Sequence, residues 1–175
     1  MWMGRSRRGR GPHFTLPYLQ VRVTPSGESE ERSMRQITPH SLWLGHVGDM
    51  RNLRDLLEHG IVAVVDLAVN EPIPTLTREL VYCRFPLVDG TGNEAWLLRA
   101  AAQAVAGFLK AEQPLFVYCA AGMSRTPVIS AAGLALATGR TPDECLAGVT
   151  AGGPSDVTPQ LWHEVKQAVF GAARV

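Results

Sequence analysis

Apolar runs separated by turn-forming residues recur along the sequence and predict the strands of a sheet. Residues 61–68, IVAVVDLA, are largely β-branched and almost all apolar, a pattern typical of a strand buried on both faces. Shorter apolar runs predict further strands at 41–46, 81–87 and 114–118.

Amphipathic segments lie between these runs and predict helices. One helix is expected after Asp49, which we interpret as its N-cap, with Gly60 as its stop. A second helix is expected to begin at the cap Asn93 and to end near 111, and a third spans 126–138. Strands that alternate with helices in this way predict an α/β fold with a mainly parallel central sheet flanked by helices.

Two later helices are marked by their first residues. The stretch TPDE at 141–144 has the Thr and Glu spacing of a capping box, with Pro142 at the first helical position. Thr158 and Pro159 open the last predicted helix, whose inner stripe consists of Leu161, Val165, Ala168 and Ala172.

Small and polar residues follow two of the predicted strands, at the strand ends where sites gather in parallel sheets. Strand 81–87 leads into VDGTGN, and strand 114–118 leads into CAAGMSR. The amides of residues 120–125 can form a ring of N–H donors at a helix N-terminus, which favours phosphate or sulfate. Small residues at 120–122 let the backbone approach such a ligand closely.

Cys119 and Arg125 suit the same anion. The planar guanidinium of Arg125 can bind two oxygens at once. A helix N-terminus beside this cation stabilises a thiolate on Cys119. A thiolate aimed at a bound phosphate predicts covalent phosphoryl transfer, and we expect the Ser124 hydroxyl to donate to the sulfur when it leaves.

Asp89 is the candidate general acid. The leaving oxygen of a phosphate ester needs a proton, so a carboxylic acid is expected on a neighbouring loop. Asp89 follows the strand at 81–87, and Gly90 and Gly92 beside it permit movement. The same group, as a carboxylate, can then activate water against the phosphocysteine.

The stretch VYCAAGMSR resembles the active-site loop of the cysteine-dependent protein phosphatases: Cys, five residues and Arg, with Gly fourth and Ser before Arg. Over residues 37–170 the chain is more specifically similar to the atypical dual-specificity phosphatases of the protein tyrosine phosphatase superfamily. The segment FPLVDGTGN resembles their general-acid loop, and AAGLALATGRTPDECLAGV resembles their helix pair after the catalytic loop.

The resemblance implies a protein-tyrosine-phosphatase-like fold of the dual-specificity type. It implies Cys119 as nucleophile, Asp89 as general acid and base, and Ser124 as partner of the thiolate. The phosphate is then bound by the Arg125 side chain and by the loop, which comprises Ala120, Ala121, Gly122, Met123, Ser124 and Arg125. No metal or organic cofactor is implied.

Tyr118 departs from the family pattern. The family usually places a His directly before the nucleophile, hydrogen-bonded so as to order the loop, whereas this sequence has Tyr. We interpret Tyr118 as a packed aromatic residue with a hydrogen-bonded hydroxyl rather than as a catalyst. The substitution bears on the stability of the thiolate and on turnover.

Composition and charge narrow the class of protein. Hydrophobic residues make up 46% and charged residues 19% of the chain, an ordinary balance for a globular domain. The formal net charge of +1 argues against a protein dedicated to nucleic acid or membrane surfaces. Cys83, Cys119 and Cys145 form no C-x-x-C pair, which favours a reducing compartment; we expect a cytoplasmic location, with Cys83 and Cys145 in the core.

Two segments of different character divide the chain. Residues 1–35 are expected to form a flexible or extended tail, and residues 36–175 the phosphatase catalytic domain. The tail begins Arg-rich, which leaves a nuclear or organellar address open as an alternative.

The expected function is hydrolysis of phosphate monoesters through a phosphocysteine, on phosphotyrosine or on phosphoserine and phosphothreonine in proteins. A pseudophosphatase that binds phosphorylated partners is an alternative, favoured by Tyr118 alone. A rhodanese-like sulfurtransferase is a second alternative, but its chemistry needs no acid such as Asp89. The expected partner is a phosphorylated protein or another phosphomonoester, with no membrane or nucleic acid, and the protein is expected to be a monomer.

Overall fold

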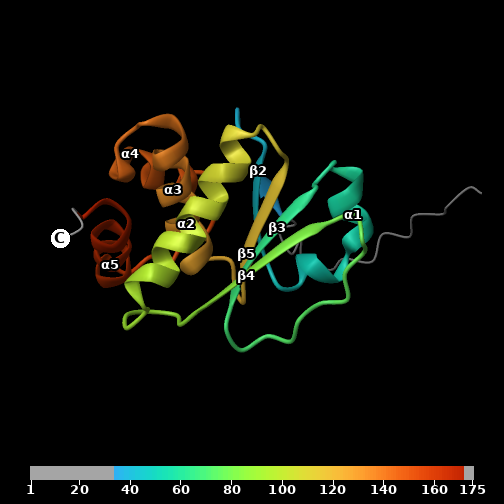
Figure 1. Ribbon diagram of the computed structural model, residues 1–175, viewed down its shortest axis with the longest axis horizontal. Helices are drawn as coiled ribbons and strands as arrows, with labels where there is room; N and C mark the ends of the chain where they lie inside the picture. The colour runs from blue at the N-terminus through green and yellow to red at the C-terminus, as the bar shows by residue number, and fades with distance from the viewer. Residues whose placement is uncertain (1–33, 172–175) are drawn as a thin grey trace, which may run out of the picture. The chain divides into compact units, whose positions relative to one another are not determined.

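The computed structural model describes residues 34–171 of the 175-residue chain. These residues form a five-stranded sheet with helices packed against it (Figure 1). The strand order is β1-β2-β5-β3-β4. All neighbours are parallel except the short β1, which is antiparallel to β2. The strands are β1 (Arg35–Gln36), β2 (Leu42–His46), β3 (Ala63–Ala68), β4 (Val81–Leu87) and β5 (Leu115–Cys119). The structure therefore confirms the predicted, mainly parallel sheet.

Helices cover both faces of this sheet, and Figure 1 shows α2, α3, α4 and α5 on one side and α1 on the other. Their bounds are η1 (Asp49–Arg51), α1 (Leu53–Glu58), α2 (Ala95–Lys110), α3 (Arg125–Thr138), α4 (Pro142–Thr150) and α5 (Pro159–Phe170). None of the helices within residues 34–171 has the length and apolar character that crossing a membrane requires.

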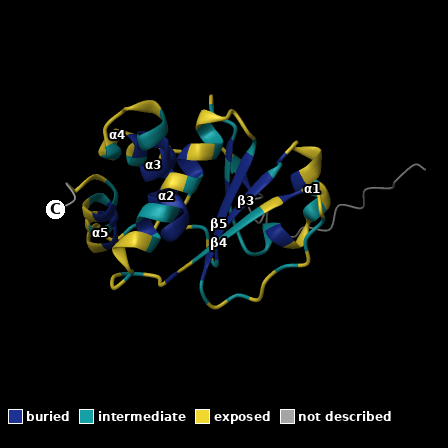
Figure 2. Ribbon diagram, viewed as in Figure 1, coloured by how far each residue is buried: buried dark blue, intermediate teal, exposed yellow. Residues whose placement is uncertain are grey.

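Successive residues of the central strands point to opposite faces and build two cores. Val65 and Val117 belong to the larger core, which packs against α2, α3, α4 and α5. Val64 and Phe116 belong to the smaller core beneath α1. This alternation explains why β3 and β5 read as continuous apolar runs: both of their faces are covered, as the buried strands in Figure 2 show.

The capping box predicted at 141–144 is present. The Thr141 Oγ1 accepts the amide of Glu144, and the Glu144 carboxylate accepts the amide of Thr141 in return. Thr158 likewise caps α5, and Leu161, Val165 and Ala168 of its predicted inner stripe are buried, whereas Ala172 lies outside the described residues. These helix starts could be predicted because capping is a local interaction between near neighbours.

Two predicted caps are wrong. Asn52, not Asp49, caps α1 through its side chain, while the Asp49 carboxylate accepts the amide of His46 at 2.8 Å. The second long helix begins at Ala95 with Glu94 as its N-cap, so Asn93 lies in the preceding loop. In both cases the polar side chain binds backbone outside the expected helix.

The expected tail at 1–35 lies almost entirely outside the described residues. Its last residue, Arg35, begins β1, and its guanidinium donates to the carbonyl of Val149 at 2.6 Å. Cys145 is buried in the larger core as expected, and Cys83 is half-buried and packs against the same core.

Candidate active site

Cys119 stands at the carboxyl end of β5, the middle strand of the sheet. Residues 120–124 then turn back, and α3 begins at Arg125. The residues opposite this strand end are His46 on β2, paired with Cys119, and Asp66 on β3, paired with Tyr118. The loop thus has the predicted setting, between a buried strand and the N-terminus of a helix.

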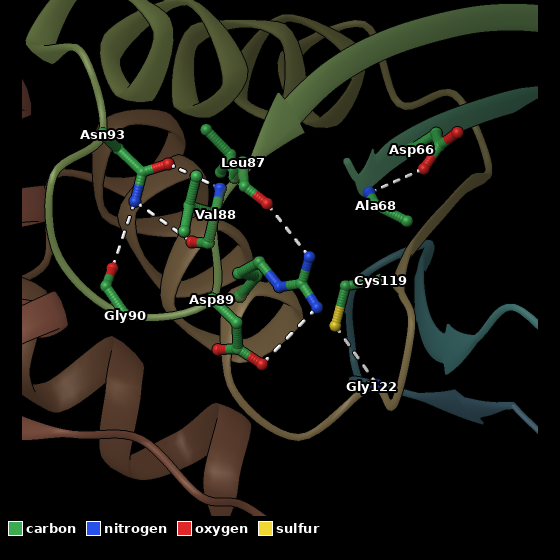
Figure 3. Close-up of polar contacts among 10 residues, drawn as sticks. Asp66, Ala68, Leu87, Val88, Asp89, Gly90, Asn93, Cys119 and Gly122 are labelled. Atoms are coloured by element: carbon green, nitrogen blue, oxygen red, sulfur yellow. Dashed lines mark hydrogen bonds and ion pairs between the residues drawn. The ribbon is translucent and has the colours of Figure 1, made fainter. Parts of the chain in front are cut away.

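The loop between β5 and α3 closes over the sulfur. Cys119 is only 1% exposed, and the amide of Gly122 donates to its Sγ at 3.2 Å (Figure 3). Gly122 has φ +73°, a left-handed conformation that an L side chain rarely adopts. An amide donor of this kind stabilises negative charge on the sulfur.

Gly45 on β2 presses against this loop, a contact that the sequence analysis missed. A Cβ on Gly122 would lie 2.7 Å from the carbonyl oxygen of Gly45. A Cβ on Gly45 would in turn overlap the Asp49 carboxylate and lie 2.7 Å from the ring of Phe116. Gly45 on β2 and Gly122 in the loop therefore allow this loop to lie directly on the end of β2.

Arg125 is buried in the first turn of α3 and faces the acid loop, which we define as residues 88–94. Its Nη1 donates to the carbonyl of Leu87 at 3.0 Å, and its Nη2 lies 3.5 Å from the carboxylate of Asp89 (Figure 3). Its Nε is buried and has no partner within residues 34–171. Because a guanidinium carries five N–H donors, Arg125 keeps donors for the oxygens of an anion.

The acid loop is folded around the side chain of Asn93. Its Oδ1 accepts the amide of Val88 at 2.8 Å, and its Nδ2 donates to the carbonyls of Val88 and Gly90, both at 3.1 Å. Asp89 lies two residues after the end of β4, and its side chain is 55% exposed. The carboxylate therefore reaches solvent while its backbone is held.

A second side chain that the sequence analysis missed, Glu164 on α5, binds the same loop. Its Oε1 accepts the amide of Gly92 at 2.8 Å, from a position 72 residues later in the chain. Gly92 has φ +90°, which is again favourable for glycine alone. Nothing in the local sequence marks Glu164, since it is one acidic residue on a half-exposed helix.

Next to β5, which ends at Cys119, lies a polar cluster centred on the buried Asp66. The Asp66 carboxylate accepts the amide of Ala68 at 2.8 Å and the hydroxyl of Tyr82, and it lies 3.6 Å from the Nε of Arg84. Arg84 also donates to the carbonyl of Glu71 at 2.8 Å. Asp66 therefore links β3 to β4 through its buried carboxylate.

Tyr118 completes this cluster on the face of the sheet under α1. It is 1% exposed and stacks on Phe116, with ring centroids 5.6 Å apart. Burial, and next the negative charge of Asp66, raise the pKa of Tyr118 far above its ordinary value. Burial and the hydrogen bond to Asp66 raise the pKa of Tyr82 to about 12. Both hydroxyls therefore keep their protons at neutral pH, and Tyr118 is the packed aromatic residue that the sequence predicts.

The remaining predicted loop residues differ in burial. Ser124 is the buried N-cap residue of α3, and within residues 34–171 the sulfur's hydrogen-bond donor is the amide of Gly122 rather than the Ser124 hydroxyl. Met123 and Ala121 are exposed, and the carbonyl of Met123 accepts the amide of Asp156 at 2.8 Å. The rim contributed by this loop is thus neutral.

The described residues offer no set of three His, Cys, Asp or Glu side chains placed to share a metal ion. The structure instead brings together a thiol, a guanidinium and a carboxylate, from Cys119, Arg125 and Asp89. These groups can hold a tetrahedral anion above the sulfur and supply one exchangeable proton beside it.

We compared the sequence and the fold with those of known proteins. No family model matches the sequence, and no curated protein does. Solved structures do: human DUSP28 has 20% identity and a TM-score of 0.69, covering 78% of this chain and 93% of its own. The human tyrosine phosphatase-like serine/threonine/tyrosine-interacting protein has 20% identity and a TM-score of 0.67, with 78% and 95% covered. PTPMT1 in complex with PI(5)P has 19% identity and a TM-score of 0.64, with 78% and 94% covered. The chain therefore has the fold of the dual-specificity phosphatases, as its sequence predicts.

Proposed function

We propose that this protein is a phosphatase that hydrolyses phosphate monoesters through a phosphocysteine. The observation that carries the proposal is the convergence of Cys119, Arg125 and Asp89 at the N-terminus of α3. The fold shared with phosphatases supports this reaction by analogy, whereas the residues at the site supply its chemistry.

In the first step the Cys119 thiolate attacks phosphorus, and the bond between phosphorus and the ester oxygen breaks. The Asp89 carboxylic acid gives its proton to the departing oxygen, so the alcohol leaves neutral. Arg125 and the loop amides hold the remaining phosphate oxygens, whose charge shifts during transfer. The product of this step is a phosphocysteine and an ionised Asp89.

In the second step the Asp89 carboxylate takes a proton from water, and the resulting hydroxide attacks phosphorus. The sulfur–phosphorus bond breaks, inorganic phosphate leaves, and the thiolate returns with Asp89 protonated. The amide of Gly122 stabilises the departing sulfur, and the Ser124 hydroxyl is proposed to do the same.

Phosphorylated side chains of proteins are the proposed substrates. Ala121 and Met123 on the rim are neutral, and Asp156 lies beside Met123, so the rim offers no added cation for a polyphosphorylated ligand. A single phosphate on a protein side chain needs only Arg125 and the loop. One of the similar structures holds PI(5)P, which makes a lipid headgroup the natural comparison substrate.

A phosphate-binding module without turnover is the second candidate, and Tyr118 favours it. Its hydroxyl lies in the Asp66 cluster, so it does not take the loop-ordering place that the family's histidine has. The Asp89–Arg125 pair favours catalysis, since binding alone needs no acid beside the phosphate.

Release of phosphate from p-nitrophenyl phosphate in the presence of a chelator tests the proposal. Wild-type protein should release phosphate, Cys119→Ser should release none, and Cys83→Ser, the matched control, should behave as wild type. Asp89→Ala should lower kcat by about 100-fold or more on alkyl phosphates, which are poor leaving groups. A folded wild-type protein that binds vanadate but releases no phosphate between about pH 5 and pH 8 would establish the binding module instead.

A further inference from the structure

We propose that Glu164 is a positioning residue for Asp89: by holding the amide of Gly92, it fixes the acid loop on α5. The inference rests on the proposed function, because it concerns how the general acid of that reaction is held. Glu164 does not touch the substrate, and its effect is exerted through the loop.

The geometry joins the loop to a rigid support. The Glu164 Oε1 accepts the Gly92 amide at 2.8 Å. Leu161 and Val165, on either side of Glu164 along α5, are fully buried in the larger core. The helix therefore cannot follow the loop if the loop moves, and the hydrogen bond acts as an anchor.

The other bonds of the loop do not provide this anchor. The three hydrogen bonds of Asn93 run to Val88 and Gly90, so they close the loop upon itself. Within residues 34–171, side-chain hydrogen bonds and ion pairs join the acid loop, residues 88–94, to other elements at two places only. These are the Asp89–Arg125 pair and the Gly92–Glu164 bond.

The Asp89–Arg125 contact is weaker in the first step of the proposed reaction, when Asp89 must be held beside the leaving group. In the first step Asp89 must be protonated, so its charge attraction to the guanidinium is lost. A bound phosphate dianion also competes for the same N–H donors of Arg125. The Gly92–Glu164 bond involves neither group and persists through proton transfer.

The burial of the second carboxylate oxygen of Glu164 also supports the positioning role. Its Oε2 is buried and has no partner within residues 34–171. A desolvated carboxylate oxygen costs free energy that a surface glutamate avoids by turning toward water. The bond to Gly92 offsets this cost and keeps the side chain turned inward.

Leaving-group dependence provides the test. Glu164→Ala should lower kcat about tenfold on an alkyl phosphate, with KM unchanged, because a loosely held acid protonates a poor leaving group badly. On p-nitrophenyl phosphate, whose leaving group needs little protonation, kcat should stay within about twofold of wild type. Glu164→Gln keeps an oxygen acceptor and should restore the alkyl phosphate rate, and Gln167→Ala, one turn further along α5, is the matched control.

Each alternative result is decisive. Equal slowing on both esters, or a Glu164→Gln protein as slow as Glu164→Ala, would overturn the positioning role and leave the phosphatase proposal standing. A wild-type protein that hydrolyses neither ester overturns the phosphatase proposal, and this inference with it. If Glu164→Ala does not fold, Glu164→Asp replaces it: the shorter carboxylate keeps the charge but not the reach, and wild-type rates on both esters would overturn the inference.

Discussion

The guanidinium of Arg125 donates to the backbone carbonyl of Leu87 at 3.0 Å. Leu87 is the last residue of β4, and Asp89 follows it two positions later. Arg125, the proposed phosphate-binding residue, is therefore tied to the end of the strand that leads to Asp89, the proposed general acid. This contact fixes the first turn of α3 relative to the loop that follows β4.

Replacing Arg125 by lysine should show whether the planar geometry of the guanidinium matters beyond its positive charge. A lysine ammonium keeps the positive charge but cannot bind the Leu87 carbonyl and two phosphate oxygens in one plane. We expect Arg125→Lys to lower kcat/KM by about 100-fold or more on p-nitrophenyl phosphate. Arg54→Lys, at an exposed helix pair with Glu58, is the control and should have no effect. If Arg125→Lys has near wild-type kinetics, the guanidinium does not bind the phosphate as proposed.

Two glycines with the same backbone conformation make a matched pair. Gly122 has φ +73° and Gly139 has φ +74°, so alanine at either position should cost about 1 kcal/mol of strain. Only at Gly122 would the new Cβ meet backbone, 2.7 Å from the Gly45 oxygen, while nothing lies within 4 Å at Gly139. Gly122→Ala should therefore lose both stability and activity, and Gly139→Ala stability alone. Urea unfolding and initial rates decide this, and equal losses of activity would contradict it.

Tyr118 is expected to serve stability rather than catalysis. Tyr118→Phe keeps the stacking on Phe116 and removes a buried hydroxyl, which should lower the free energy of unfolding by about 1 kcal/mol. The kcat on p-nitrophenyl phosphate should stay within about threefold of wild type, because the ring faces away from the phosphate loop. A large loss of kcat with unchanged unfolding would show that the hydroxyl takes part in the reaction.

The raised pKa of Tyr82 predicts a loss of stability at alkaline pH. Its pKa rises from 10.0 to about 12 on folding, so the folded state favours the protonated phenol. The stability from this group is fully present below pH 10 and is lost as pH rises through about 12. The denaturant midpoint, followed across this range, should fall in wild type and fall less in Tyr82→Phe. Identical curves for the two proteins would contradict the prediction.

The sequence allowed much of the fold to be predicted, because the informative interactions are local. The apolar runs at 61–68 and 81–87 identify strands, and the pair Thr141 and Glu144 caps its own helix. Asn is common at helix N-caps, so the sequence predicts Asn93 as a cap, but its side chain binds Val88 and Gly90 instead. Only the folded loop distinguishes these two uses of the same residue type.

Contacts between distant segments could not be predicted in this way. Asp66 is the one charged residue of the apolar run 61–68, and its neighbours in the sequence do not reveal that strand register places it opposite Arg84. The approach of Gly45 to Gly122 likewise depends on the pairing of β2 with β5. The cytoplasmic location and the monomeric state stay predictions, as does the tail before residue 34.

The hydrogen bond that anchors the acid loop can form only late in translation. Gly92 leaves the ribosome 72 residues before Glu164, its partner on α5. A nascent or prematurely terminated chain that stops before α5 already contains the cysteine, the arginine and the aspartate, yet lacks the helix that steadies the last of these. Under the proposed function, translation of α5 would therefore complete both the larger core and the support of the acid loop.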